Sequence, residues 1–240
     1  MRGSPTTSHS DAVTDAAAEL DQLGADLERR FRTAHTVVSI AGRDVDLLHP
    51  ASYDDLISEE DFVRDDRLPY WTDIWPSSHA LAERVARLDG AGKRAIELGC
   101  GLGLVVTAAA RAGYDVLATD YYDDALEFAR VNAWRNAGAV IATRHVDWRR
   151  FPGNLGTFDL VLASDVLYER AYAPLLADAF SDTLAKGGVV LLADPGRVGR
   201  EEFLSLCGPR GLYVREAEEV PFTAGEIRQT ITIFELIRPW

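Results

Sequence analysis

Short apolar runs alternate with helical patterns through the second half of the chain. Five runs have the length of buried strands, at 94–98, 115–119, 140–145, 158–163 and 188–193. Between and after them, apolar residues recur every three or four positions, as on one face of a helix, at 104–112, 123–136, 171–185 and 199–207. Strands that alternate with helices form βαβ units with a parallel sheet covered on both faces. The pattern therefore predicts a doubly wound α/β fold.

The C-terminal end departs from this alternation. Two further strand patterns, 212–217 and 229–236, are joined only by 218–228, which contains Pro221 and Gly225. A crossover between parallel strands needs a dozen or more residues and is usually a helix. We therefore predict an antiparallel, hairpin-like return. The complete prediction is a mainly parallel, seven-stranded sheet whose last strand is reversed.

The N-terminal quarter has its own pattern. Residues 11–32 show helical spacing of apolar residues, from Ala16 to Phe31. Residues 36–40 and 43–48 alternate apolar and polar residues around Ala41 and Gly42, as in a β-hairpin. The polar residues before them are expected to be a disordered tail. The predicted organisation of the chain is a tail at 1–10, an N-terminal helix, hairpin and acidic segment at 11–67 packed on the main domain, and the main domain at 68–240.

An acidic segment and an aromatic segment lead into the main domain. Residues 52–67 carry seven Asp and Glu side chains. They form either a solvated helix or loop, which is the simpler interpretation, or a flap beside a substrate mouth. Residues 70–75 carry a tyrosine and two tryptophans, which either plug one end of the core or form the wall of a ligand site. Ser77 is the predicted N-cap of a helix over 78–88.

Composition and charge narrow the classes of partner. The chain has 240 residues, 47% of them hydrophobic, and a formal net charge of −13. An acidic surface repels phosphate backbones and anionic membranes, so we expect neither nucleic acid nor membrane as a partner. It suits a basic small molecule or a lysine-rich protein segment, although many proteins are simply acidic. Two cysteines do not make a disulfide framework. Without a span-length apolar run or a signal-peptide core, we expect a cytoplasmic protein.

The candidate chemistry is centred on the glycine-rich turn that follows the first of the five runs. Its glycines at 99, 101 and 103 would bring a ligand to a helix N-terminus, where backbone N–H groups favour anions. The dinucleotide fingerprint needs its third glycine at the position of Leu104. Glu97, at the entrance of the turn, suits a ligand with an amino group. Asp120 ends the next strand, where an acid can bind a ribose diol. These features indicate a nucleotide-like ligand other than a dinucleotide.

The motif Glu97-Leu98-Gly99-Cys100-Gly101-Leu102-Gly103, with Asp120 and the reversed last strand, resembles class I S-adenosylmethionine-dependent methyltransferases. The segments 69–76, 146–148 and 163–168 look like signatures of the seven-strand protein lysine methyltransferases. The chain is most similar to the branch with the electron-transfer-flavoprotein β-subunit lysine methyltransferase and bacterial relatives described as predicted nicotinamide N-methylases. The resemblance implies a Rossmann-like methyltransferase fold, S-adenosylmethionine as cofactor and S-adenosylhomocysteine as product.

The resemblance also implies roles for individual residues. Asp120 would bind the ribose hydroxyls, Tyr121 would lie near the adenine, and Asp147 would accept from the adenine amino group. The full set implied to bind the cofactor is Trp71, Glu97, Gly99, Cys100, Gly101, Gly103, Asp120, Tyr121, Asp147, Trp148, Ala163 and Ser164. Asp165 and Tyr168 would face the nucleophile as the catalytic pair. No metal is implied.

Structural alternatives remain open for several of these residues. Asp147 could cap a turn, Trp71 and Trp148 could belong to the core, and Tyr168 could start the next helix. Residues 194–197 could border the substrate mouth, although a turn is the simpler interpretation. Asp165 follows a parallel strand at its carboxyl end, where such folds bind ligands.

Three functions are compatible with the motifs. The leading one is N-methylation of a lysine side chain in a protein with an accessible lysine. The same chemistry on a small amine or heterocycle, such as a nicotinamide-like ring, is the second. A cofactor-binding scaffold without activity is the third. A sulfonium methyl donor is already activated, so the enzyme has mainly to align the reacting groups and exclude water. An amine must also lose its proton, and Asp165 could orient it or remove that proton directly or through water.

Overall fold

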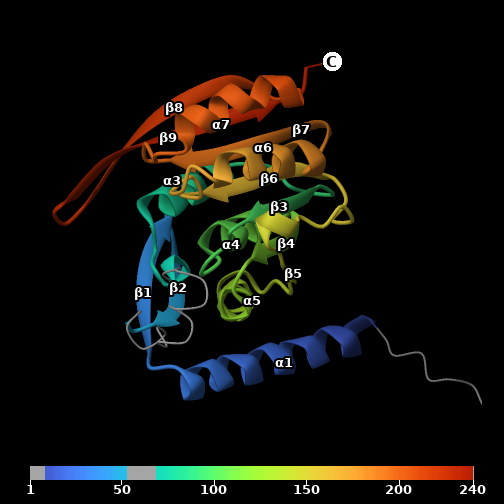
Figure 1. Ribbon diagram of the computed structural model, residues 1–240. Coiled ribbons are helices and arrows are strands. Elements are labelled where there is room, and N and C mark those ends of the chain that lie inside the picture. Colours follow the sequence, from blue (N-terminus) through green and yellow to red (C-terminus); the bar gives the residue numbers. More distant parts are fainter. Residues whose placement is uncertain (1–8, 53–68, 240) are drawn as a thin grey trace, which may run out of the picture.

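A seven-stranded sheet forms the centre of the computed structural model, which describes residues 9–52 and 69–239 (Figure 1). The order of the strands is β5-β4-β3-β6-β7-β9-β8. Their bounds are Arg94–Leu98 (β3), Asp115–Asp120 (β4), Ala142–His145 (β5), Phe158–Ser164 (β6), Leu184–Asp194 (β7), Tyr213–Ala224 (β8) and Ile227–Ile237 (β9). Strands β3 to β7 pair in parallel, whereas β9 is antiparallel to both β7 and β8. The predicted mainly parallel sheet with a reversed last strand is confirmed.

Helices cover both faces of the sheet. Their bounds are Pro76–Val85 (α3), Leu104–Arg111 (α4), Asp123–Ala137 (α5), Tyr172–Thr183 (α6) and Arg200–Cys207 (α7). Neighbouring residues of β3 point to opposite faces: Ala95 packs in the cluster that contains buried residues of α3 and α4, and Ile96 packs in the cluster that contains Phe180 of α6 and Phe203 of α7. The two buried clusters therefore lie on opposite faces of one sheet, as a doubly wound fold requires.

The order of the strands creates a switch point beside β3. From β3 the chain continues to β4 and β5 on one side, and β6 and β7 lie on the other side. Ligands bind in such folds where the connections diverge, outside the carboxyl ends of the strands. The carboxyl ends of β3, β4 and β6 carry the glycine turn, Asp120 and Ser164.

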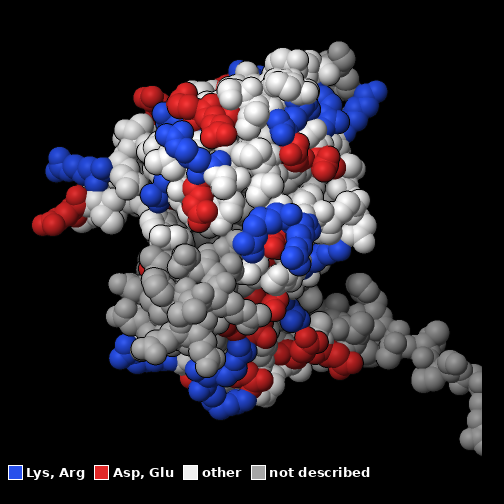
Figure 2. All heavy atoms as spheres, in the orientation of Figure 1, with Lys and Arg blue, Asp and Glu red and all other residues white. Residues whose placement is uncertain are grey.

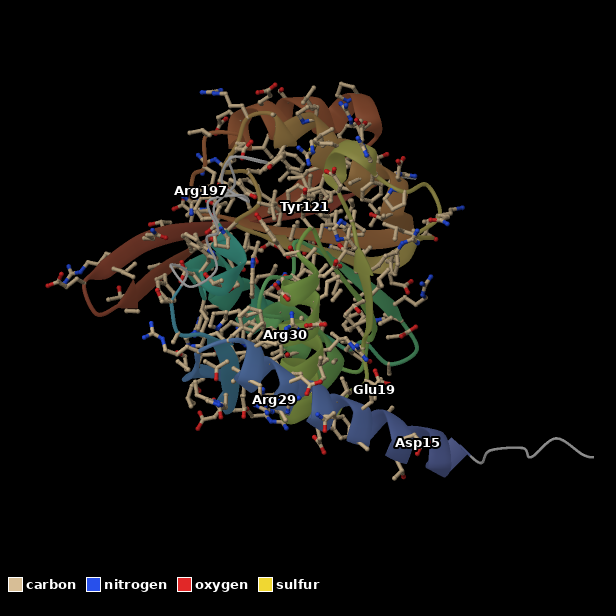
Figure 3. The ribbon with its side chains drawn as sticks, turned by 60° about the horizontal axis from the view of Figure 1, so that its bottom comes forward. Asp15, Glu19, Arg29, Arg30, Tyr121 and Arg197 are labelled. Carbon is tan, nitrogen blue, oxygen red and sulfur yellow. The ribbon has the colours of Figure 1, made fainter. Side chains whose placement is uncertain are left out.

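The N-terminal elements are α1 (His9–Arg30), β1 (Thr33–Ile40) and β2 (Arg43–Pro50). Helix α1 packs across α5 (Figures 1 and 3), and Arg30 at its C-terminal end pairs with Asp124 and Glu127 of α5. Buried Asn132 of α5 joins this layer to the main domain. Its side chain bonds both backbone groups of Leu48 in β2, at 2.9 and 3.0 Å, and the carbonyl of Leu102 in the glycine turn at 2.9 Å.

Several predicted boundaries were wrong. The α3 helix begins at Pro76 with Trp75 as N-cap, so Ser77 lies inside the helix and is buried, and α3 ends at Val85. Strand β7 begins at Leu184, inside the predicted helix 171–185. The predicted link 218–228 is mostly strand, because β8 continues to Ala224 and only residues 225 and 226 separate it from β9. Pro221 fits there because β8 is an edge strand, whose outer N–H groups have no ladder partner.

Parts of the N-terminal prediction lie outside the described residues. These are residues 1–8 of the predicted tail and nearly all of the acidic segment 52–67, with only Ser52 described. Within the described ranges, none of the helices combines the length and the apolar composition that a bilayer crossing needs. On the described part of the face in Figure 2, acidic and basic side chains are interspersed.

Candidate active site

A cleft that is open to solvent lies at the carboxyl edge of the sheet. Its walls come from the segment before α3, the glycine turn after β3, and the residues that follow β4, β5 and β6. Eleven of the fourteen predicted site residues line it, namely Trp71, Gly99, Cys100, Gly101, Asp120, Tyr121, Asp147, Trp148, Ser164, Asp165 and Tyr168. Glu97, Gly103 and Ala163 do not belong to the described lining.

The three glycines of the turn have positive φ angles of 78°, 49° and 83°, which side chains other than glycine rarely adopt. A Cβ on Gly101 would come 3.3 Å from the carbonyl oxygen of Trp71, so the turn passes close under the aromatic segment. A Cβ on Gly103 would lie 2.7 Å from Cα of Ala129 in α5. Gly101 therefore shapes the cleft, whereas Gly103 lets the start of α4 approach α5.

Asp120 joins the end of β4 to the glycine turn. Its carboxylate accepts the backbone N–H of Gly101 at 2.9 Å and that of Tyr122 at 3.1 Å. Burial raises the pKa of Asp120, and these backbone donors oppose the rise. A carboxylate has about four acceptor sites, so Asp120 retains capacity for hydroxyl donors from the cleft.

Glu97 is buried at the entrance of the turn with only 1% of its surface exposed. Its Oε2 atom has no hydrogen-bond partner among the described residues. Burial raises the pKa of Glu97 well above its usual value, and the negative charge of Asp120 adds to the rise. A buried polar atom without a partner is costly, so a donor or cation delivered by a ligand would relieve it.

Asp147 and Trp148 lie on the β5 side of the cleft. Asp147 accepts from both the backbone N–H and Nε of Arg149 at 3.0 Å, as the N-cap of a short 3-10 helix at Trp148–Arg150. The turn-capping alternative is therefore observed, in a residue that also lines the cleft. Trp148 packs edge-on against Tyr172 at 5.3 Å between ring centroids.

Asp165 occupies the opposite wall, after β6. Its φ angle is 60°, which Asp tolerates better than most side chains, and its backbone N–H donates to Ala193 O in β7 at 3.0 Å. Its carboxylate accepts from Ser77 Oγ at 3.1 Å and from Arg197 Nε at 2.5 Å. Neither Ser77 nor Arg197 is among the predicted site residues, because each lies far from Asp165 in the sequence.

A continuous series of edge-on aromatic rings crosses this wall. Tyr70 packs against Trp75 at 6.1 Å and against Tyr168 at 5.3 Å, and Tyr168 packs against Tyr172 at 5.3 Å. With Trp148 these residues form what we term the aromatic arc, comprising Trp75, Tyr70, Tyr168, Tyr172 and Trp148. Tyr168 precedes α6 rather than starting it. Trp71 lies apart from the arc and packs against Phe128 at 5.6 Å, as both a core residue and a cleft wall.

The residues fit S-adenosylmethionine by the chemistry of their donors and acceptors. The unpartnered Glu97 oxygen matches a cationic amino group, the remaining acceptor sites of Asp120 match ribose hydroxyls, and the turn at Gly99 and Gly101 leaves room for close approach. Among the described residues, no three His, Cys, Asp or Glu side chains are grouped as a metal site requires.

Comparisons with known proteins identify the family of the chain. A family model described as lysine methyltransferase matches residues 71–207. EEF1A lysine methyltransferase 3 of Mus musculus is 31% identical over an alignment of 155 residues that covers 60% of this chain and 65% of that protein. The electron transfer flavoprotein beta subunit lysine methyltransferase of Danio rerio is 31% identical over 138 residues, 56% of this chain and 53% of that protein. The chain thus matches between about half and two thirds of these relatives' length.

Solved structures share the fold. Magnesium protoporphyrin IX methyltransferase from Synechocystis PCC 6803, with bound S-adenosylmethionine, superposes with a TM-score of 0.57 at 16% identity, over 76% of this chain and 98% of that one. The N-methyltransferase NodS from Bradyrhizobium japonicum WM9, with S-adenosylhomocysteine, gives 0.55 at 20% identity, over 76% and 97%. Family and fold together confirm the predicted S-adenosylmethionine-dependent methyltransferase class. The chain belongs to the lysine methyltransferase family.

Proposed function

We propose that the protein transfers a methyl group from S-adenosylmethionine to the side-chain nitrogen of a lysine in another protein. The observation that carries the proposal is Asp165, a carboxylate that lines the same cleft as the aromatic arc and the glycine turn. A lysine side chain can pack its aliphatic part against aromatic rings and donate an N–H of its nitrogen to a carboxylate. The match to lysine methyltransferases supports the same class of acceptor.

The residues of the turn would hold the cofactor. Glu97 would accept from its amino group, Asp120 from its ribose hydroxyls, and Asp147 from its adenine amino group, with Tyr121 and Trp148 beside the ring. The bound cofactor supplies a methyl group on a positively charged sulfur, which needs no further activation. What remains for the protein is to align the acceptor and keep water away.

Asp165 and Tyr168 would act on the acceptor. A free lysine has a pKa of about 10.4 and is protonated at neutral pH, so its nitrogen must lose a proton before it can attack. Asp165 would accept an N–H of the amine and point its lone pair into the cleft. The rings of Tyr70 and Tyr168 would pack against the aliphatic part of the side chain and exclude water.

A transfer experiment tests the acceptor class. Purified protein is incubated with methyl-labelled S-adenosylmethionine and a cell lysate, in parallel with the Asp165→Asn variant. We expect label in one or a few protein bands with the wild type, and a rate lower by at least about tenfold with the variant, since a charged hydrogen bond is lost. Label only in the small-molecule fraction would point to a small amine instead. Cofactor binding without any transfer would point to a scaffold.

A further inference from the structure

Asp165 is held by two residues that are absent from the described lining of the cleft. Ser77 Oγ of α3 donates to Oδ2 at 3.1 Å, and Arg197 Nε, from the loop after β7, donates to Oδ1 at 2.5 Å. The Asp165 side chain is only 5% exposed. The carboxylate is therefore fixed from outside the cleft, and its remaining acceptor sites are available to a donor inside it.

Arg197 is itself held in place at both ends. Its backbone N–H donates to Oδ1 of Asp194 at 3.0 Å, next to the N–H of Gly196 at 2.8 Å. Its guanidinium lies over the ring of Trp75, 5.3 Å from the centroid. Arg197 thus connects the end of β7, the acid Asp165 and the first ring of the aromatic arc. Figure 3 labels Arg197 and, nearer the middle of the view, Tyr121, which lines the cleft.

Among the described residues, the cleft that Asp165 lines also holds the carboxylates of Asp73, Asp120, Asp147 and Glu169. Asp194 is fully buried; burial raises its pKa, and the charge of Asp165 adds to the rise. The positive charge of Arg200 lowers the pKa of Asp194. Ser77, the other described residue that contacts the Asp165 carboxylate, is uncharged. Within the part of the chain that the structure describes, Arg197 is the cation in contact with the Asp165 carboxylate, and it compensates that charge. A compensated carboxylate attracts a second cation weakly, but it still accepts a hydrogen bond from a neutral amine.

We propose that Arg197 is a positioning residue for the methyl acceptor. It orients Asp165 and, by compensating its charge, keeps the site from trapping the protonated amine, so that the neutral, nucleophilic amine is favoured. The proposal deepens the proposed function and rests on it, since it concerns an amine acceptor in the same cleft. Removal of Arg197 should therefore strengthen the binding of an alkylammonium ion while it slows methyl transfer. A residue that merely supports the fold would weaken both.

The test uses Arg197→Met and Arg197→Lys, with n-butylammonium as the probe of the acceptor site. The dissociation constant of the probe is measured by titration calorimetry in the presence of S-adenosylhomocysteine. This measurement does not require a known substrate. We expect Arg197→Met to bind the probe about 5- to 10-fold more tightly, as for one uncompensated charge pair near a surface. Transfer to the lysate proteins should fall about 10- to 100-fold. Arg197→Lys should bring both the probe affinity and the transfer rate part of the way back to the wild-type values. Lysine keeps the positive charge but lacks the planar arrangement of N–H donors of the guanidinium group.

Arg210→Met is the matched control, because Arg210 forms a comparable pair with Asp178 at 2.6 and 3.1 Å on the surface. It should change neither probe binding nor transfer. The proposal is overturned if Arg197→Met binds the probe as the wild type does or more weakly, or if it loses cofactor affinity together with activity. If Arg197→Met does not fold, Arg197→Gln, which also removes the charge, takes its place in the same two measurements. Absence of protein labelling by the wild type would refute the proposed function, whereas the calorimetric result tests Arg197 separately.

Discussion

The Asp120 carboxylate accepts the backbone N–H of Gly101 at 2.9 Å, so the acid at the end of β4 holds the glycine turn at the end of β3. We expect Asp120→Ala to weaken binding of S-adenosylmethionine at least about tenfold. The variant loses the hydrogen bond from the glycine turn to the carboxylate and also the proposed bonds from the ribose hydroxyls of the ligand. Quenching of tryptophan fluorescence on titration with the cofactor measures this. Asp123→Ala is the control, since its side chain is 81% exposed. Equal losses in the two variants would contradict the assigned role.

Gly103 has a packing role, unlike Gly101 in the same turn, which shapes the cleft. Gly103→Ala should lower the free energy of unfolding by about 2–3 kcal/mol, because the new Cβ meets the backbone of Ala129 at 2.7 Å and φ is +83°. Gly138→Ala carries the strain of a positive φ without the clash, since nothing lies within 4 Å, and should cost about 1 kcal/mol. Urea unfolding of both variants measures the difference. Similar losses would remove the argument for close packing of α4 on α5.

Glu97 predicts a dependence of stability on pH. Its pKa in the folded protein is raised well above the value in the unfolded chain, about 4.3. Between those two values the unfolded chain has lost the proton and the folded protein keeps it, so stability falls as pH rises through this window. Glu97→Gln cannot ionise. In urea unfolding without cofactor, its free energy of unfolding relative to wild type should therefore increase from pH 4.5 to pH 8. A constant difference across that range would show that Glu97 does not carry this linkage.

The hydrogen bonds of Asn132 connect the N-terminal hairpin to the main domain, and their contribution to the free energy of unfolding can be measured. Asn132→Ala would leave the backbone groups of Leu48 and the carbonyl of Leu102 without their partner. We expect a loss of about 2–4 kcal/mol in the free energy of unfolding, since buried groups without partners pay their desolvation cost. Asn136→Ala, whose bonds to Asp46 are exposed, should cost less. Thermal unfolding of the two variants provides the comparison, and the reverse order would be inconsistent with Asn132 as the main connection.

Local patterns in the sequence were enough to predict the strands and turns that depend on neighbouring residues. Strand β3 and the turn at Gly99–Gly103 were placed correctly because a buried run followed by spaced glycines has few alternatives. The length of β8 was not predictable from Pro221, since proline breaks a central strand but is accepted at the edge. Ser77 and Arg197 were missed because their roles arise from contacts with Asp165 over separations of 88 and 32 residues. The polar sequence Asp194–Arg197 was the available signal for Arg197, and it indicated a turn.

The reaction that we propose for the cleft is methylation of a lysine in another protein. The most direct measurement is tandem mass spectrometry of the protein bands labelled by the purified enzyme, with Asp165→Asn run in parallel. The account predicts methyl groups on lysine side-chain nitrogens with the wild type, and their loss with Asp165→Asn while that variant still binds S-adenosylmethionine. Methyl groups found on other residues, label confined to small molecules, or full activity of Asp165→Asn would contradict it.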